Sequence, residues 1–246
     1  MGKRYHKFYS GALGRDMEMH IHGHAGKPCV VFPSQDGHYG DYESFGMLEP
    51  CGPFLEAGKL RLYCVDGIDA ETWSNRHAHP RDRMLRHEAW FRYLTDELTP
   101  FIHYDANWDD RRMTTGCSMG ATHAANLLFR RPDLYDTVIA LSGAYDAAWF
   151  MDGYVDDLVH LNSPVSSISA MPHDHPYVNL LNSCTIILCA GQGAWEDEMR
   201  RSMGLLKNAM DAKGINAWFD YWGGDVNHDW PWWRVQMRYF LEKVLG

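Results

Sequence analysis

Short apolar runs recur along the whole chain, separated by polar and glycine-rich segments. A run of four to eight residues with apolar or alternating positions is typical of a β-strand. The runs that fit this pattern cover residues 4–9, 17–22, 29–32, 60–65, 112–115, 137–141, 184–189 and 217–221. We predict that these segments are strands.

Between many of these runs, apolar residues recur at the spacing of a helix. The helical patterns cover residues 90–98, 121–129, 196–213 and 230–245. Pro100 is expected to kink or end the first helix, because proline lacks the N–H that a helix interior needs. Gly214 should close the third helix, and Asp229 should cap the fourth.

Strands that alternate with helices predict a mostly parallel, twisted sheet with helices on both faces. The first two or three strands have short connections, so we expect them to be antiparallel at one edge. Residues 144–181 interrupt the alternation with short mixed segments and several prolines. We interpret this stretch as a small cap-like insertion within one domain that spans residues 1–246.

Composition narrows the function classes. The formal net charge is −9 and we find no basic stripe, which argues against nucleic-acid binding. No apolar run approaches the roughly 18 residues that a membrane span needs, and the N-terminus lacks the apolar stretch of a signal peptide. The six cysteines form no CxxC motif. We expect a soluble, cytoplasmic protein with reduced thiols, and homo-oligomerisation remains open.

A glycine-rich pentapeptide, GCSMG at residues 116–120, stands between a predicted strand and a predicted helix. Reactive side chains of a parallel sheet lie at the carboxyl ends of its strands. Glycines two residues before and after a serine permit the sharp turn of a nucleophile elbow. We therefore predict that Ser118 is a catalytic nucleophile. Cys117 precedes it and should point into the sheet, so we do not assign it this role.

A serine hydroxyl needs an adjacent base that a third group orients. In hydrolases with a strand-borne nucleophile elbow the chain order is Ser, acid, His. Of the histidines after Ser118, only His228 lies between the last predicted strand and the final helix. We predict that His228 is the base.

The acid is expected just after the preceding strand, in GQGAWEDE at residues 191–198. Glu196, Asp197 and Glu198 all have the right chemistry, and each could equally be a solvated carboxylate at a helix start. Glu196 comes first and is our choice. Asp197 and Asp225 stay open as alternative acids, although Asp225 also fits an ordinary turn after two glycines.

An oxyanion hole usually takes one backbone N–H from the residue after the nucleophile, which is Met119 here. The second N–H comes from the loop after an earlier strand. FPSQDG at residues 32–37 supplies that loop. Gln35 is our choice, with Ser34 as the alternative.

Several segments share their order with one family: FPSQDG, VDGIDAETWSN, GCSMGATHAANLLFRRPDLYDTVIALSGAYD, GQGAWEDE and NHDWPWW. From about Lys27 to the C-terminus, the chain resembles α/β-hydrolase esterases of the esterase D and enterochelin-esterase type. The resemblance implies an α/β-hydrolase fold, carboxylic-ester hydrolysis, and no metal or organic cofactor. By position it implies a triad of Ser118, Glu196 and His228, with Met119 and Gln35 in the oxyanion hole.

The resulting hypothesis is a serine esterase that acts on a small-molecule ester through an acyl-enzyme. A predicted insertion of under about 40 residues is small for a lid over a long-chain channel, so we expect short-acyl esters. Two alternatives remain: an acyltransferase that uses the same residues, and a non-catalytic binding protein with this fold.

His20, His22 and His24 recur at every second position of a predicted strand. One strand face would carry all three, and imidazoles so placed could bind Zn²⁺ or Ni²⁺. We favour the simpler interpretation, an exposed strand face, and assign no metal site.

Overall fold

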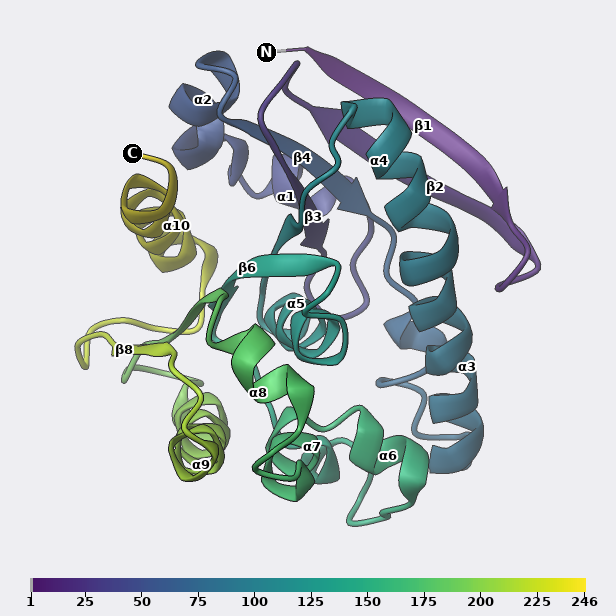
Figure 1. Ribbon diagram of the computed structural model, residues 1–246, viewed down its shortest axis with the longest axis vertical. Helices are drawn as coiled ribbons and strands as arrows, with labels where there is room; N and C mark the ends of the chain where they lie inside the picture. Colours follow the sequence, from purple (N-terminus) through teal and green to yellow (C-terminus); the bar gives the residue numbers. More distant parts are fainter. Residues whose placement is uncertain (1) are drawn as a thin grey trace.

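The computed structural model describes residues 2–246. Its centre is one eight-stranded sheet with the order β1-β2-β4-β3-β5-β6-β7-β8 (Figure 1). The strands are β1 Lys3–Ser10, β2 Arg15–His22, β3 Lys27–Phe32, β4 Leu60–Val65, β5 Arg112–Cys117, β6 Tyr135–Leu141, β7 Thr185–Ala190 and β8 Trp218–Tyr221. All eight correspond to predicted strands, with ends shifted by up to two residues.

The two N-terminal strands form the antiparallel edge that the short connections predicted. β1 pairs antiparallel with β2, and β2 pairs antiparallel with β4. From β4 to β8 every neighbouring pair is parallel. The carboxyl ends of β3, β5, β6, β7 and β8 therefore lie at the same edge of the sheet, and the loops that leave them can form one site.

Helices cover both faces of the sheet (Figure 1). They are α1 Asp41–Ser44, α2 Leu48–Glu56, α3 Pro80–Arg92, α4 Thr99–Ala106, α5 Met119–Arg130, α6 Asp157–Leu161, α7 Pro164–Ala170, α8 Pro176–Leu181, α9 Asp197–Lys213 and α10 Trp230–Leu245. Alternate residues of β3 divide between two cores: Cys29 and Val31 pack with residues of α2 and α10, and Val30 and Phe32 pack with residues of α3 and α5. Because side chains alternate across a strand, one short apolar run serves both cores.

The helix that contains Pro100 continues through the proline. Residues Tyr93–Leu98 form a π-helical segment between α3 and α4, and Pro100 lies in the first turn of α4. Thr99 Oγ1 donates a hydrogen bond to the carbonyl oxygen of Leu94 at 2.7 Å. The wider π-helical turn before the proline accommodates the missing N–H. Prolines are a common cause of such distortions in helices. The helix therefore does not end here.

Residues 144–181 lie between β6 and β7 and form the short helical segment η3 (Ala147–Trp149) followed by α6, α7 and α8. The sequence predicted an insertion here but not its helices. Elsewhere, Gly214 adopts a left-handed conformation (φ 67°) and ends α9, and the side chain of Asp229 accepts a hydrogen bond from Trp230 N at the start of α10. Within the described residues, no helix combines the length and apolarity that crossing a membrane requires.

Candidate active site

Ser118 lies in the turn between β5 and α5, with φ 56° and ψ −124°. This backbone conformation costs a non-glycine residue about 1–3 kcal/mol and persists only where the surroundings enforce it. Ser118 N donates a hydrogen bond to Leu141 O at 2.9 Å, and the flanking glycines let the neighbouring backbone pack closely around the turn. A Cβ on Gly116 would lie 2.3 Å from the carbonyl carbon of Gly120, and one on Gly120 would lie 2.4 Å from the carbonyl oxygen of Pro33. The turn can be this tight only because both residues lack a side chain.

Replacing Gly120 with Ala should therefore destabilise the protein. The new methyl group would overlap backbone atoms that cannot rotate away, so we expect a loss of about 1–3 kcal/mol in the free energy of unfolding. Gly204→Ala is the matched control, because Gly204 lies inside α9 with no atom within 4 Å of a built Cβ. Alanine there should stabilise by about 0.4–1 kcal/mol. Urea denaturation of both variants tests this, and equal stabilities would contradict it.

The structure brings Ser118 and His228 together across 110 residues of sequence. His228 Nε2 lies 2.8 Å from Ser118 Oγ, within hydrogen-bond distance. His228 is in the loop between β8 and α10, and its ring meets the ring of Trp233 edge-on at 4.9 Å. The packing against Trp233 fixes the plane of the imidazole, and the hydrogen bond fixes which nitrogen faces the serine.

Backbone hydrogen bonds join the loop after β7 to the loop that carries His228. His228 N donates to Ala194 O at 3.0 Å, and Gly193 N donates to Val226 O at 2.9 Å. A Cβ on Gly193 would lie 2.3 Å from the side chain of Asn227. The glycines of GQGAWEDE thus let the two loops approach each other closely. This close approach sets the positions of Glu196 and His228.

Glu196 is completely buried directly before α9. Its Oε1 atom lies 3.6 Å from His228 Nδ1, which is ion-pair distance but longer than a hydrogen bond. The same oxygen accepts a hydrogen bond from Ser142 Oγ at 2.5 Å, and Ser142 Oγ accepts one from Trp233 Nε1 at 3.0 Å. Ser142 and Trp233 therefore hold the carboxylate beside the imidazole.

Sequence analysis did not find Ser142. It follows β6 directly and has φ 57°, a left-handed conformation like that of Ser118. The available signal was its place at the carboxyl end of a parallel strand in the segment ALSGAYD. A serine at that edge was a candidate for contact with the site.

Within residues 2–246, none of the other carboxylates considered as acids lies within 4.0 Å of a His228 ring nitrogen. The side chain of Asp197 is 91% exposed and pairs with Arg200. Glu198 lines the cavity described below but pairs with Arg201 at 2.7 Å. Asp225 is exposed in the turn after β8. Glu196 is the carboxylate that lies beside His228 Nδ1, at 3.6 Å.

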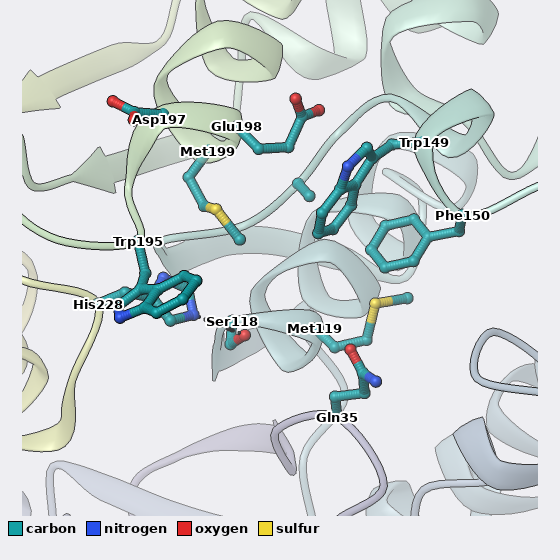
Figure 2. Close-up of a pocket in the computed structure, with 11 residues that line it drawn as sticks. Gln35, Ser118, Met119, Trp149, Phe150, Trp195, Asp197, Glu198, Met199 and His228 are labelled. Atoms are coloured by element: carbon teal, nitrogen blue, oxygen red, sulfur yellow. Dashed lines mark hydrogen bonds between the residues drawn. The ribbon is translucent and has the colours of Figure 1, made fainter. Parts of the chain in front are cut away.

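Met119 and Gln35 approach Ser118 from two elements. Met119 is the first residue of α5. Gln35 lies in the loop after β3, and Gly120 in the first turn of α5 packs against the start of that loop. Both residues line the same cavity as Ser118 (Figure 2), whereas Ser34 does not. Within residues 2–246, neither the Met119 N–H nor the Gln35 N–H donates a hydrogen bond to another element or loop. Both are therefore available to an incoming oxygen atom.

A cavity of about 510 Å³ opens beside Ser118 and His228 (Figure 2). Its apolar lining comes largely from Trp149 and Phe150 of the 144–181 region and from Trp195 and Met199 near the start of α9. Trp195 is 86% exposed and has φ 67°. The cavity has the size of a small-molecule pocket. Sequence analysis missed Trp149, Phe150 and Trp195, because nothing local to them indicates that they face the serine.

Cys117 is buried on the opposite face of the sheet from α5, among residues of the α2 and α10 core. Burial raises the pKa of its thiol well above the ordinary value. The thiol therefore stays protonated at neutral pH and does not face the cavity.

The prediction of an exposed histidine face on β2 is wrong. His22 is only 2% exposed and His20 is largely buried, while His24 lies beyond the strand end and is exposed. Burial lowers the pKa of His22 to about 4 and lowers the pKa of His20 as well. The sequence could not reveal this, because the cover comes from Tyr39 and α1, which follow a different strand.

Several solved structures share the fold of this chain. A ferulic acid esterase superposes with a TM-score of 0.76 at 16% identity, over 99% of this chain and 97% of its own. An S-formylglutathione hydrolase from Agrobacterium tumefaciens gives 0.72 at 16% identity, over 99% and 95%. The fluorophosphonate-binding serine hydrolase F of Staphylococcus aureus gives 0.70 at 13% identity, over 100% and 98%. These likenesses establish the α/β-hydrolase fold.

No curated protein matches the chain by sequence. The sequence profile of the protein family described as "Putative esterase" does match, over residues 10–243. That range includes every strand from β2 to β8 and all the residues around the cavity. The chain therefore belongs to the Putative esterase family and is an esterase of the α/β-hydrolase fold.

Proposed function

We propose that the protein hydrolyses small or short-acyl carboxylic esters through Ser118, His228 and Glu196. The observation that carries this proposal is the 2.8 Å contact between Ser118 Oγ and His228 Nε2 at the mouth of an apolar cavity. A serine with a positive φ at the end of a central strand, hydrogen-bonded to an imidazole, is the arrangement that activates a hydroxyl for attack.

In the first half-reaction, Ser118 Oγ attacks the ester carbonyl carbon while His228 Nε2 accepts the hydroxyl proton. The carbonyl oxygen becomes an oxyanion, which the N–H groups of Met119 and Gln35 would bind, with help from the positive end of α5. His228 then donates its proton to the leaving alcohol oxygen as the carbon–oxygen bond breaks. The product is an acyl-enzyme on Ser118 and a free alcohol.

In the second half-reaction, a water molecule attacks the acyl carbon and gives its proton to His228. The acid is released, and the proton returns to Ser118 Oγ. Throughout the cycle the Glu196 carboxylate fixes the imidazole tautomer and stabilises the imidazolium that forms twice. His228 Nδ1–H would donate a hydrogen bond to Glu196 Oε1 once substrate binding shortens their 3.6 Å separation.

The cavity supports a small substrate. Its volume of about 510 Å³ is bounded by Trp149 and Phe150 on one side and by Met199 near α9 on another. We expect kcat/KM on p-nitrophenyl esters to be highest at short acyl lengths and to fall beyond them. A maximum at about ten carbons or more would contradict this. Methyl ferulate belongs in the same panel, because one structural neighbour is a ferulic acid esterase.

Two measurements separate this proposal from its alternatives. A fluorophosphonate probe should label the wild-type protein at Ser118, whereas a non-catalytic binding protein would stay unlabelled. Product analysis with added alcohol acceptors should give mainly the free acid. Mainly transferred ester would identify an acyltransferase.

A further inference from the structure

A cluster of three potential metal ligands lies outside the cavity, between β2 and α1. His20 and His22 share one face of β2, and Glu43 reaches them from α1. One ligand atom from each residue lies within 4.8 Å of the others. We propose that His20, His22 and Glu43 bind a divalent transition-metal ion of the Zn²⁺ type.

The buried imidazole nitrogens point to a missing ligand. His22 Nε2 and His20 Nδ1 are buried, and neither has a hydrogen-bond partner within residues 2–246. A buried polar atom without a partner typically costs about 1–3 kcal/mol, so native structures rarely tolerate two side by side. A metal ion would supply a bond to both nitrogens at once.

The donor set suits Zn²⁺. Two imidazoles and one carboxylate, with a water in the fourth position, form a common zinc coordination sphere. In a tetrahedral zinc site the ligand atoms lie about 3.3 Å from one another. His20 Nδ1 and Glu43 Oε2 are already 3.4 Å apart. The His22 ligand atom lies within 4.8 Å of both. α1 is a four-residue helix whose Glu43 side chain is 38% exposed, so this side chain can adjust to an ion.

Lys3 already pairs with the carboxylate of this cluster. Its Nζ atom contacts Glu43 Oε2 at 2.5 Å, and its side chain is 45% exposed. Lys3 can swing into solvent when an ion binds, but it competes for the carboxylate until then. Removing its charge should therefore strengthen metal binding by up to about fivefold, the scale of an exposed ion pair. If the three residues bind no metal ion, removing the Lys3 charge would not change metal affinity.

The site would connect two parts of the fold. The ring of Tyr39 packs edge-on against His20 at 4.6 Å, and Tyr39 belongs to the loop that runs from Gln35 to α1. A metal ion would fasten this segment to β2. Because binding to the folded state raises stability by mass action, the melting temperature should rise with metal concentration.

The test uses the full chain, untagged and freed of metal with a chelator. Isothermal titration with Zn²⁺ measures affinity and stoichiometry, and the d–d absorption of Co²⁺ reports coordination directly. The ligand variants are Glu43→Gln and His20→Ala. Matched controls are His24→Ala, on the same segment but exposed, and the double variant His173→Ala/His175→Ala, which removes two histidines just before α8. Lys3→Met tests the competition.

We expect one ion per chain in the wild type and a loss of at least about tenfold in affinity in both ligand variants. Both controls should bind as the wild type does, and Lys3→Met should bind more tightly. Absence of binding, or binding that survives Glu43→Gln and His20→Ala, would overturn the proposal. Loss of binding in either control would do the same. The esterase proposal does not depend on this result.

Discussion

The Ser118→Ala variant is expected to lose about 10⁵- to 10⁶-fold in kcat, the scale seen when a serine hydrolase loses its nucleophile. No other hydroxyl takes its place, because Ser142 Oγ is engaged with Glu196 and Trp233. The measurement is kcat on one p-nitrophenyl ester, together with labelling by a fluorophosphonate probe. Both signals should disappear.

Cys117→Ala is the matched control, one residue away in sequence. Cys117 packs in the core on the other face of the sheet, so we expect kcat within about fivefold of the wild type, which corresponds to roughly 1 kcal/mol. Comparable losses in the two variants would mean that the nucleophile is misplaced.

The second large effect is expected for Glu196→Gln, with kcat reduced about 10³- to 10⁴-fold. Glutamine has the same shape, so packing around the buried side chain is kept. Its amide can donate a hydrogen bond to His228 Nδ1 and stabilise the wrong imidazole tautomer, with the proton on Nε2. That tautomer cannot accept the proton of Ser118.

Asp197→Asn and Asp225→Asn are the controls for this experiment. Asp197 pairs with Arg200 at the surface, and Asp225 is exposed in a turn. Each variant should retain kcat within a few-fold of the wild type. If either is the crippling change, the acid is misassigned, although the contact between Ser118 and His228 would still stand.

Much of the fold could be predicted from local sequence patterns. Mostly apolar runs such as 60–65 are buried along their whole length, as is typical of a central strand in a parallel sheet. The helix ends at Gly214 and Asp229 follow from backbone chemistry that a single residue supplies. Chain order and strand position together selected Ser118 and His228 for the site.

The failures share one cause, which is that burial depends on partners distant in sequence. The histidines of β2 look like an exposed face, because the residues that cover them follow β3. Trp149 and Trp195 look like ordinary surface aromatics until η3 and the start of α9 bring them to one cavity.

The sequence by itself determined the α/β class, the strand-to-helix turn at Ser118 and the need for glycine on both sides of it. These features depend on side-chain alternation and backbone sterics within a few residues. Only the tertiary structure shows how the carboxylates at residues 196, 197, 198 and 225 lie relative to His228. Their local chemistry is equivalent, and it is Glu196 that is buried beside His228 and bonded to Ser142. That contact joins loops after three different strands, and no local pattern encodes it.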